Sequence, residues 1–178
     1  MAFYEIELSD IRNSIPFLKT GDEVTLSGTA YTARDAAHKK FFQLLDEGKE
    51  LPIDIKDACI YFAGPTPSPE GLPIGSCGPT TSGRMDPYSP RLLDLGLAAM
   101  IGKGKRSQAV IDAIVRNKAI YFCAVGGAGA LCAEHIKAYD EIAFPELGCE
   151  SVKKLELDRF PVFVGIDCFG NNIFERKK

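Results

Sequence analysis

The sequence predicts a single α/β or α+β domain that spans residues 1–178. Short alternating or apolar runs, typical of strands, are interspersed with segments whose apolar residues recur at helical spacing. The composition, 46% hydrophobic and 25% charged, is that of a globular chain with one substantial core. No internal repeat and no low-complexity linker divides the chain, so we expect one layered domain of sheets and helices.

The first third of the chain predicts two strands, a helix and a third strand. Residues 4–8 and 23–31 alternate apolar and polar side chains, and a turn at 19–22 separates them. From residue 35 the apolar spacing becomes helical, which predicts a helix that begins directly after Arg34 and ends at Gly48. The continuous apolar run 58–63 predicts a buried strand.

The remainder begins with a long segment, 64–90, that is rich in Gly, Pro, Thr and Ser and is expected to be mostly loop. Loops of this length inside a domain are uncommon unless they are functional. The expected elements after it are helices at 91–100 and 108–117, a strand at 119–125, a turn at 126–129 leading to a helix that ends near residue 138, strands at 153–157 and 162–167, and a hairpin turn at 170–172.

Charge and hydropathy make several classes of partner improbable. The net charge of -3, with acids and bases intermixed, provides no broad cationic face, so no nucleic-acid partner is expected. No apolar run approaches the ~20 residues that cross a bilayer, and the N-terminus lacks the features of a signal peptide. We therefore expect no membrane association and a cytoplasmic location.

The cysteine and histidine pattern does not support a metal site contained in this chain. No C-x-x-C pair occurs, and His38 and His135 are far apart in sequence. The turn at 126–129 lacks the complete G-x-G-x-x-G of a dinucleotide site, so NAD is not inferred. The six cysteines are expected to be reduced, and most of them buried: Cys59, Cys77, Cys123, Cys132, Cys149 and Cys168.

The most informative segment is the loop GPTTSGRMD, residues 78–86. The hydroxyls of Thr80, Thr81 and Ser82 lie between glycines, Gly83 among them, that permit unusual backbone angles. Hydroxyls and backbone amides could converge there on one oxyanion, with Arg84 adding a bidentate guanidinium. This pattern predicts a carboxylate site; the alternative is a turn whose hydroxyls satisfy their own backbone.

Two further cations lie where strands or glycine turns end. Arg34 directly precedes a predicted helix, so an anion bound between its guanidinium and the helix N-terminus would be favoured. Its alternative is a surface pair with Asp35 or another acid. Lys103 is flanked by glycines that permit close approach to a ligand, whereas the neighbouring Lys105 and Arg106 equally suit a solvated basic turn.

Taken together, five segments resemble the β region of class I fumarases and L-tartrate dehydratases. They are GPTTSGRMD, the ARDAAH segment with Arg34, the GKGKRS segment with Lys103, CAVGGAGAL and FPELGCESV, in the order of that family. The resemblance covers most of the chain from about residue 28 to 167 and is specific as a set. It implies a swivelling α/β domain of layered sheets and helices.

The resemblance also implies a partner and a cofactor. In that family an α region binds a [4Fe-4S] cluster through three cysteines and leaves one iron open as a Lewis acid, while the β region grips the substrate. Only the β region is matched here. The resemblance therefore implies a separate α subunit that carries the cluster, no metal ligand from this chain, and an α2β2 assembly.

The implied reaction is the reversible hydration of fumarate to (S)-malate. Carried over by motif position, Arg34, Arg84 and Lys103 would hold a substrate carboxylate, with Thr80, Thr81, Ser82 and Gly83 lining the same site. The family pattern suggests that a threonine of this loop handles the proton on the carbon next to the distal carboxylate, and Thr80 is our candidate, with Thr81 second. A threonine could do so only if the assembled site activates its hydroxyl.

Two alternatives stay open from sequence. The same chemistry could act on tartrate or on a methyl-substituted fumarate, since the sequence does not give the size of the pocket. A different class is a non-catalytic module that binds carboxylates. A neighbouring reading frame encoding a three-cysteine α partner would argue against that module.

Overall fold

The computed structural model describes residues 1–175, and its seven strands form one sheet in the order β1-β2-β3-β4-β5-β7-β6. Strands β1 to β5 run parallel, and β7 runs antiparallel to β2, β5 and β6. Because β7 pairs with both β2 and β5, the sheet closes on itself. The strands are β1 (Phe3–Glu7), β2 (Glu23–Thr32), β3 (Cys59–Tyr61), β4 (Ala99–Gly102), β5 (Ile120–Cys123), β6 (Ile136–Ala143) and β7 (Val152–Ile166).

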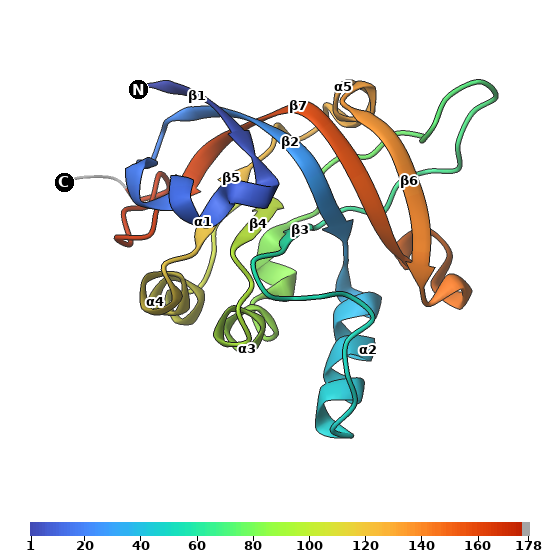
Figure 1. The fold of residues 1–178 in the computed structure, drawn as a ribbon, viewed down its shortest axis with the longest axis horizontal. Helices are drawn as coiled ribbons and strands as arrows, with labels where there is room; N and C mark the ends of the chain where they lie inside the picture. The colour runs from blue at the N-terminus through green and yellow to red at the C-terminus, as the bar shows by residue number, and fades with distance from the viewer. Residues whose placement is uncertain (176–178) are drawn as a thin grey trace.

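The helices complete a three-layer arrangement (Figure 1). Helices α2 (Asp35–Asp46), α3 (Ser89–Asp94) and α4 (Gln108–Asn117) cover one face of β3, β4 and β5, and strands β1, β2, β7 and β6 lie over the other face. The shorter helices are α1 (Ile11–Ser14), α5 (Gly129–Glu134) and the 3-10 turns η1 (Leu8–Asp10), η2 (Ile15–Phe17), η3 (Ser82–Met85) and η4 (Pro145–Glu150). No helix within residues 1–175 is long and apolar enough to cross a membrane.

Strands β3, β4 and β5 are buried on both faces, which explains their continuous apolar sequences. Alternate side chains point into two cores: Tyr61 and Ile101 enter the core between the two strand layers, and Ile60, Phe62 and Met100 enter the core beneath the helices. The predicted α/β class of layered sheets and helices is confirmed.

The sequence prediction of a helix over 91–100 is wrong in its second half. Helix α3 ends at Asp94, Gly96 adopts a φ of 108°, and the chain then enters β4. A short apolar run buried on both faces carries no periodicity that separates helix from strand. The glycine was the local signal for the helix end.

Two C-terminal expectations also need correction. The helix expected to end near residue 138 is α5, which stops at Glu134 and is followed by strand β6. Most β6 side chains are exposed because it is an edge strand that pairs only with β7, so no buried face marks it in the sequence. The strands expected at 153–157 and 162–167 are one bent strand, β7, with Arg159 at a φ of 49° opposite an irregularity in β2.

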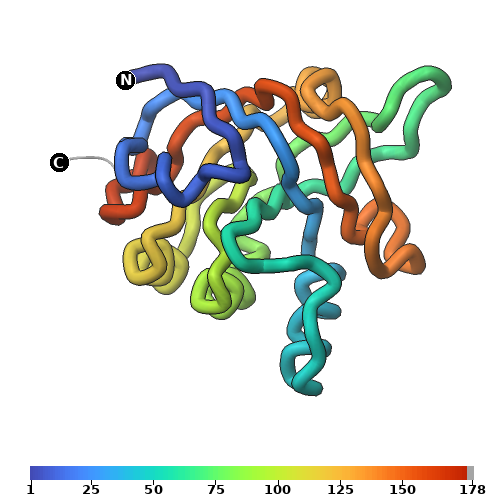
Figure 2. The backbone as a smooth tube through the Cα atoms, in the orientation of Figure 1, coloured from blue at the N-terminus to red at the C-terminus, as the bar shows by residue number. Residues whose placement is uncertain are grey.

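The other expected elements are confirmed to within a few residues, including the helix that begins after Arg34. Loop 64–80 runs out beside α5 and β6, on the side of the molecule away from the N-terminus (Figure 2). There Cys77 N donates to Gly129 O at 3.0 Å. The loop then returns across the ends of the central strands.

Candidate functional site

The predicted site residues gather at the carboxyl ends of the parallel strands. Arg34 follows β2 and Lys103 follows β4. The returning loop crosses the ends of β3 and β4: Thr80 N donates to Phe62 O at 2.7 Å, and Thr81 bridges Lys103. Ligands of parallel α/β sheets commonly bind at this edge, because the loops that follow several strands converge there.

Asp35, the first residue of α2, brings the two predicted arginines together. Arg84 Nε donates to Asp35 Oδ1 at 2.9 Å, and Arg84 Nη2 lies 2.8 Å from Asp35 Oδ2. Arg34 Nη2 lies 4.0 Å from the same Oδ2. The two guanidinium groups therefore share one carboxylate at the N-terminus of α2, although 49 residues separate Asp35 from Arg84.

The described chain leaves the hydrogen-bonding capacity of the Arg34 guanidinium unused. Its Nε lies 3.1 Å from Glu150 Oε1 but outside hydrogen-bond geometry, and its guanidinium donates no hydrogen bond to any residue within 1–175. The Arg34 side chain is 22% exposed. By contrast, five other arginines among the described residues donate side-chain hydrogen bonds to the chain: Arg12, Arg84, Arg91, Arg106 and Arg116. A planar guanidinium with open donors suits a carboxylate.

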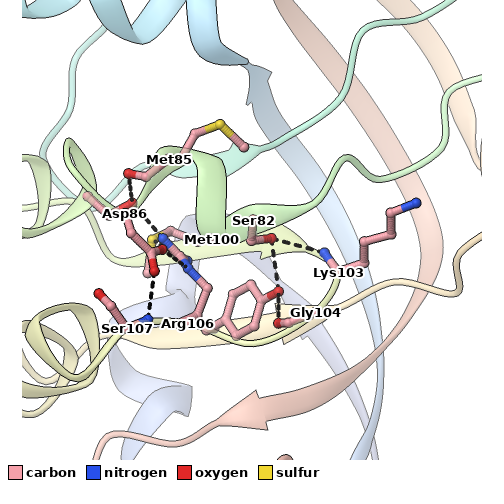
Figure 3. A network of polar contacts seen from close by, with 10 residues as sticks. Ser82, Met85, Asp86, Met100, Lys103, Gly104, Arg106 and Ser107 are labelled. Carbon is pink, nitrogen blue, oxygen red and sulfur yellow. Dashed lines mark hydrogen bonds and ion pairs between the residues drawn. The ribbon is translucent and has the colours of Figure 1, made fainter.

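Lys103 lies at the same edge, and its side chain forms no ion pair with the described residues. No ion pair of its Nζ occurs over residues 1–175, and its side chain lies along Gly126, where an added Cβ would sit 3.4 Å from Cδ. The side chain extends away from the polar network beneath it (Figure 3). The glycine turn after β5 thus leaves room for the lysine, a role the sequence pattern did not assign to it.

The hydroxyls of the loop do not all face the same way. Thr80 is half-buried and Thr81 exposed, and neither hydroxyl hydrogen-bonds to the chain within residues 1–175. Ser82 is fully buried: its Oγ accepts from Lys103 N at 3.0 Å and lies 2.9 Å from the Tyr121 hydroxyl. The two threonines therefore offer free hydroxyls, whereas the serine fixes the loop to β4 and β5.

Gly102, beneath this loop, has no room for a side chain, whereas Gly83, within the loop, has room for one. A Cβ on Gly102 would overlap Ser82 Oγ and approach a Phe62 ring carbon to 2.9 Å. Gly83 is exposed in η3, and an added Cβ would meet only Lys105 O at 3.6 Å. Close packing of the loop on β4 therefore depends on Gly102.

A buried ion pair ties the site loop to the start of α4 (Figure 3). Arg106 Nε donates to Asp86 Oδ1 at 2.7 Å, and Ser107 N donates to Asp86 Oδ2 at 2.6 Å. The Arg106 side chain is 0% exposed and lies between the rings of Phe62 and Tyr121, 5.2 and 5.0 Å from their centroids. The alternative of a solvated basic turn is therefore wrong for Arg106, although Lys105 is exposed.

The described residues do not fit an iron–sulfur cluster. Within 1–175, no group of three His, Cys, Asp or Glu side chains is placed to hold a metal ion. Cluster ligands are thiolates, and burial instead raises the pKa of Cys77 to about 12 and that of Cys123 to about 11. All six cysteines are free thiols, and only Cys149 is exposed.

Sequence reasoning did not identify Glu150 and Asp86, the acidic residues that lie against Arg34 and Arg106. Glu150 approaches Arg34 from 116 positions along the chain, and Asp86 pairs with Arg106 across 20 positions. Both lie inside the motif strings GRMD and FPELGCESV, so their presence in those segments was the available signal. Charge pairing at such separations has no local sequence pattern.

Comparisons with known proteins agree with the motif set. The family described as "Fumarase C-terminus" matches residues 2–177. The anaerobic class I fumarate hydratase of Escherichia coli K12 is 45% identical over 155 residues, covering 86% of this chain and 28% of its own length. Fumarate hydratase 2 of Leishmania major is 39% identical over 171 residues, 95% of this chain and 30% of its own length.

A shorter relative is covered almost fully. The putative L(+)-tartrate dehydratase subunit beta of Methanocaldococcus jannaschii is 36% identical over 170 residues, which is 92% of this chain and 87% of that protein. The chain thus spans less than a third of the two fumarate hydratases and most of this subunit.

Proposed function

The chain belongs to the fumarase C-terminus family, and from that premise we propose that it is the β subunit of a hydro-lyase that reversibly hydrates fumarate to (S)-malate. Two relatives that carry the fumarate hydratase name are 45% and 39% identical to this chain over most of its length. In this proposal the chain supplies the grip on the substrate carboxylates.

The observation that carries the proposal is the pair of cations without hydrogen-bonded partners at the carboxyl edge. Structural arginines of this chain donate hydrogen bonds to its own acceptors, whereas the Arg34 guanidinium donates none within the described residues. Lys103 Nζ has no ion pair within the same residues. Glu150 and Asp35, 3.1 and 4.0 Å from the Arg34 guanidinium, offset its charge without accepting its hydrogen bonds, so the open donors favour a bound anion. A dicarboxylate provides that anion.

Each site residue has a distinct role in the proposal. Arg34 and Lys103 hold a substrate carboxylate directly, and Arg84, held by Asp35, contributes a bidentate guanidinium. Ser82 positions the loop, and the backbone at Gly83 lines the site. These contacts orient the substrate and restrict its motion before the proton moves.

Thr80 is the proposed proton carrier, with Thr81 as the second candidate. The hydroxyl of Thr80 is free, and its backbone is fixed by the hydrogen bond to Phe62 O. It would take the proton from the carbon next to the distal carboxylate in the direction of malate dehydration and return it in hydration. Nearby cations lower the cost of charge on that oxygen, although a basic group from a partner is needed to make it a competent base.

The cofactor and the partner complete the proposal. Since no three side chains among the described residues are grouped to hold a cluster, we propose that a separate α subunit carries the [4Fe-4S] cluster and that the two chains assemble as α2β2. The name of the archaeal relative, a subunit beta, supports a partner chain. We also propose a cytoplasmic location, because six free thiols suit a reducing compartment.

Tartrate is the second candidate substrate. The chain covers 87% of the Methanocaldococcus jannaschii relative, and the name of that relative, a tartrate dehydratase subunit, favours tartrate. Dehydration of tartrate would use the same carboxylate grip and the same free threonine. Malate and tartrate, the substrates of the two dehydrations, differ in one hydroxyl.

Anaerobic co-purification with a candidate α chain, after cluster reconstitution, tests the proposal. We expect a stable complex that interconverts fumarate and malate, while neither chain alone does so. A stable complex that acts on tartrate but not on fumarate would select the second candidate. A stable, cluster-loaded complex inactive on both substrates, or no complex with any candidate α chain, would contradict the hydro-lyase proposal and favour a carboxylate-binding module.

A further inference from the structure

His38 lies in α2, one turn after Arg34, with its ring fully buried. Its Nδ1 is 2.8 Å from Arg34 O, and its backbone N donates to the same oxygen at 2.9 Å. A carbonyl oxygen only accepts hydrogen bonds, so Nδ1 carries the hydrogen and Nε2 holds a lone pair. The ring therefore anchors the Arg34 carbonyl from a second direction.

The other ring nitrogen shows that packing alone does not explain a histidine here. Nε2 is buried and has no hydrogen-bond partner among residues 1–175. The ring centroid lies 6.0 Å from that of Phe41 and 5.6 Å from those of Phe62 and Tyr88. A phenylalanine would suit such an aromatic cage and would avoid burying an unpaired nitrogen. What histidine adds is the Nδ1 hydrogen bond to Arg34.

The ring stays neutral under ordinary conditions, so this donor does not change. Burial, and to a lesser extent the nearby Arg106 guanidinium, lowers the pKa of His38 to about 4, against the opposing effects of the Arg34 carbonyl and Asp35. At neutral pH the ring therefore keeps one hydrogen, which the Arg34 carbonyl retains at Nδ1.

The Arg34 guanidinium has two carboxylate neighbours, Glu150 at 3.1 Å and Asp35 at 4.0 Å, so within residues 1–175 the hydrogen bonds to its carbonyl are the directional contacts of the residue. No side-chain cap holds the residue at the start of α2, and its guanidinium makes no hydrogen bond to the described chain. Its side chain lies against Gly64, where an added Cβ would be 3.1 Å from Arg34 Cδ and 3.2 Å from Nη1. The direction of the guanidinium thus follows from the position of its backbone.

We propose that His38 is a positioning residue of the diacid site: its Nδ1–H holds the Arg34 carbonyl and thereby sets the direction from which the guanidinium meets a substrate carboxylate. The inference rests on the proposed function and names a residue that does not itself touch substrate. A displaced guanidinium weakens the carboxylate contact more than it changes the proton transfer, so the effect belongs in KM.

Four variants in the reconstituted complex test this role. His38→Asn keeps an N–H near the Nδ1 position, His38→Gln moves it toward the Nε2 position, and His38→Phe keeps only the ring. We expect Phe and Gln to raise the KM for the diacid at least about tenfold while kcat changes less than about threefold, and Asn to stay within about threefold of the unsubstituted complex. His135→Phe is the matched control, because His135 Nδ1 is 2.9 Å from Asp158 O in a bond of the same kind remote from the site, and its KM should not change.

If His38→Phe fails to fold, the comparison of His38→Asn with His38→Gln still tests the role. Equal KM values for Asn and Gln, or a KM for Phe within about twofold of the unsubstituted complex, would overturn the inference. An NMR measurement that does not depend on activity tests the positioning role separately from the proposed function. The isolated chain is labelled with ¹⁵N-arginine, and the Arg34 Nε resonance is assigned with Arg34→Lys. This resonance should shift in His38→Phe and not in His38→Asn. An unchanged Arg34 resonance in His38→Phe would overturn the positioning role whatever substrate the complex uses.

Discussion

The charged side chains at the carboxyl edge differ in how far the chain itself satisfies them. Arg106 is buried and fully engaged, Arg84 is paired with Asp35 at the surface, and Arg34 and Lys103 have no hydrogen-bonded partner among residues 1–175. This gradient separates structural cations from those available to a ligand. The charge pattern of the sequence does not reveal which of these side chains are hydrogen-bonded within the chain.

Replacing Arg84 by alanine should impair activity and leave the fold intact. The side chain is 52% exposed and its pair with Asp35 lies at the surface, so the unfolding free energy should change by less than about 1 kcal/mol. Loss of a bidentate carboxylate contact should lower kcat/KM of the reconstituted complex roughly 100-fold, or about 3 kcal/mol. Steady-state kinetics and urea unfolding measure the two effects, and near-normal kcat/KM would exclude Arg84 from the carboxylate grip.

The buried His38 should make the chain acid-sensitive. The unfolded ring has its ordinary pKa of 6.5 and the folded ring a pKa of about 4, so the unfolded state binds more protons between these values. The contribution of this group to the unfolding free energy should therefore be fully present above pH 6.5. It should fall by about 3 kcal/mol as the pH drops toward 4. Urea unfolding across this range should show a smaller loss for His38→Asn; an identical pH slope in the variant would contradict the assignment.

At the scale of elements, the site loop is held by two attachments that come from different strands. Ser82 bonds to the end of β4, and Asp86 joins Arg106 and the start of α4. Together with the buried side chain of Met85, these polar attachments position the loop that carries the two threonines.

Asp86→Ala should be among the costly substitutions of this domain. It leaves the Arg106 guanidinium buried without its counter-ion and removes the acceptor for Ser107 N, which costs about 3–5 kcal/mol in comparable buried pairs. The matched control is Asp46→Ala, which breaks the exposed pair with Arg91 and should cost less than about 1 kcal/mol. Equal losses in urea unfolding would show that burial of Arg106 does not matter.

Gly102→Ala should destabilise the attachment of the loop to β4. The new Cβ would overlap Ser82 Oγ and crowd Phe62, and overpacking of this kind costs about 1–3 kcal/mol. Gly83→Ala is the control, because its Cβ would have ordinary space and the unfolding free energy should stay within about 0.5 kcal/mol of the unsubstituted chain. Thermal unfolding that ranks the two variants equally would contradict the packing seen here.

The elements that the sequence predicted well are those with one buried face. Helices α2 and α4 have clear apolar stripes, and strand β2 alternates, so local spacing is enough to find them. Strand β4, buried on both faces, and edge strand β6, mostly exposed, have no such contrast, and both were missed. The candidate site cations were predicted from motif strings and come together in the structure, but the ion pair between Asp86 and Arg106 depends on tertiary packing that local spacing does not encode.

At the scale of the whole molecule, the closed sheet brings distant segments to one edge. Loops after β2, β3, β4 and β5 meet there, and η4 adds Glu150 beside Arg34. The resulting site has cations and free hydroxyls, while the described residues have no metal-binding cluster. In the proposed enzyme this division makes the chain a substrate-binding half whose activity depends on its partner.

The most direct test is the kcat/KM of fumarate hydration by the reconstituted complex carrying Arg34→Gln, measured beside Arg91→Gln as a matched surface control. We predict a fall of roughly 100-fold for Arg34→Gln, with complex formation retained, and no change for Arg91→Gln, whose guanidinium pairs with Asp46 at the surface. An Arg34→Gln complex with unchanged kcat/KM would contradict the claim that this arginine holds the substrate carboxylate.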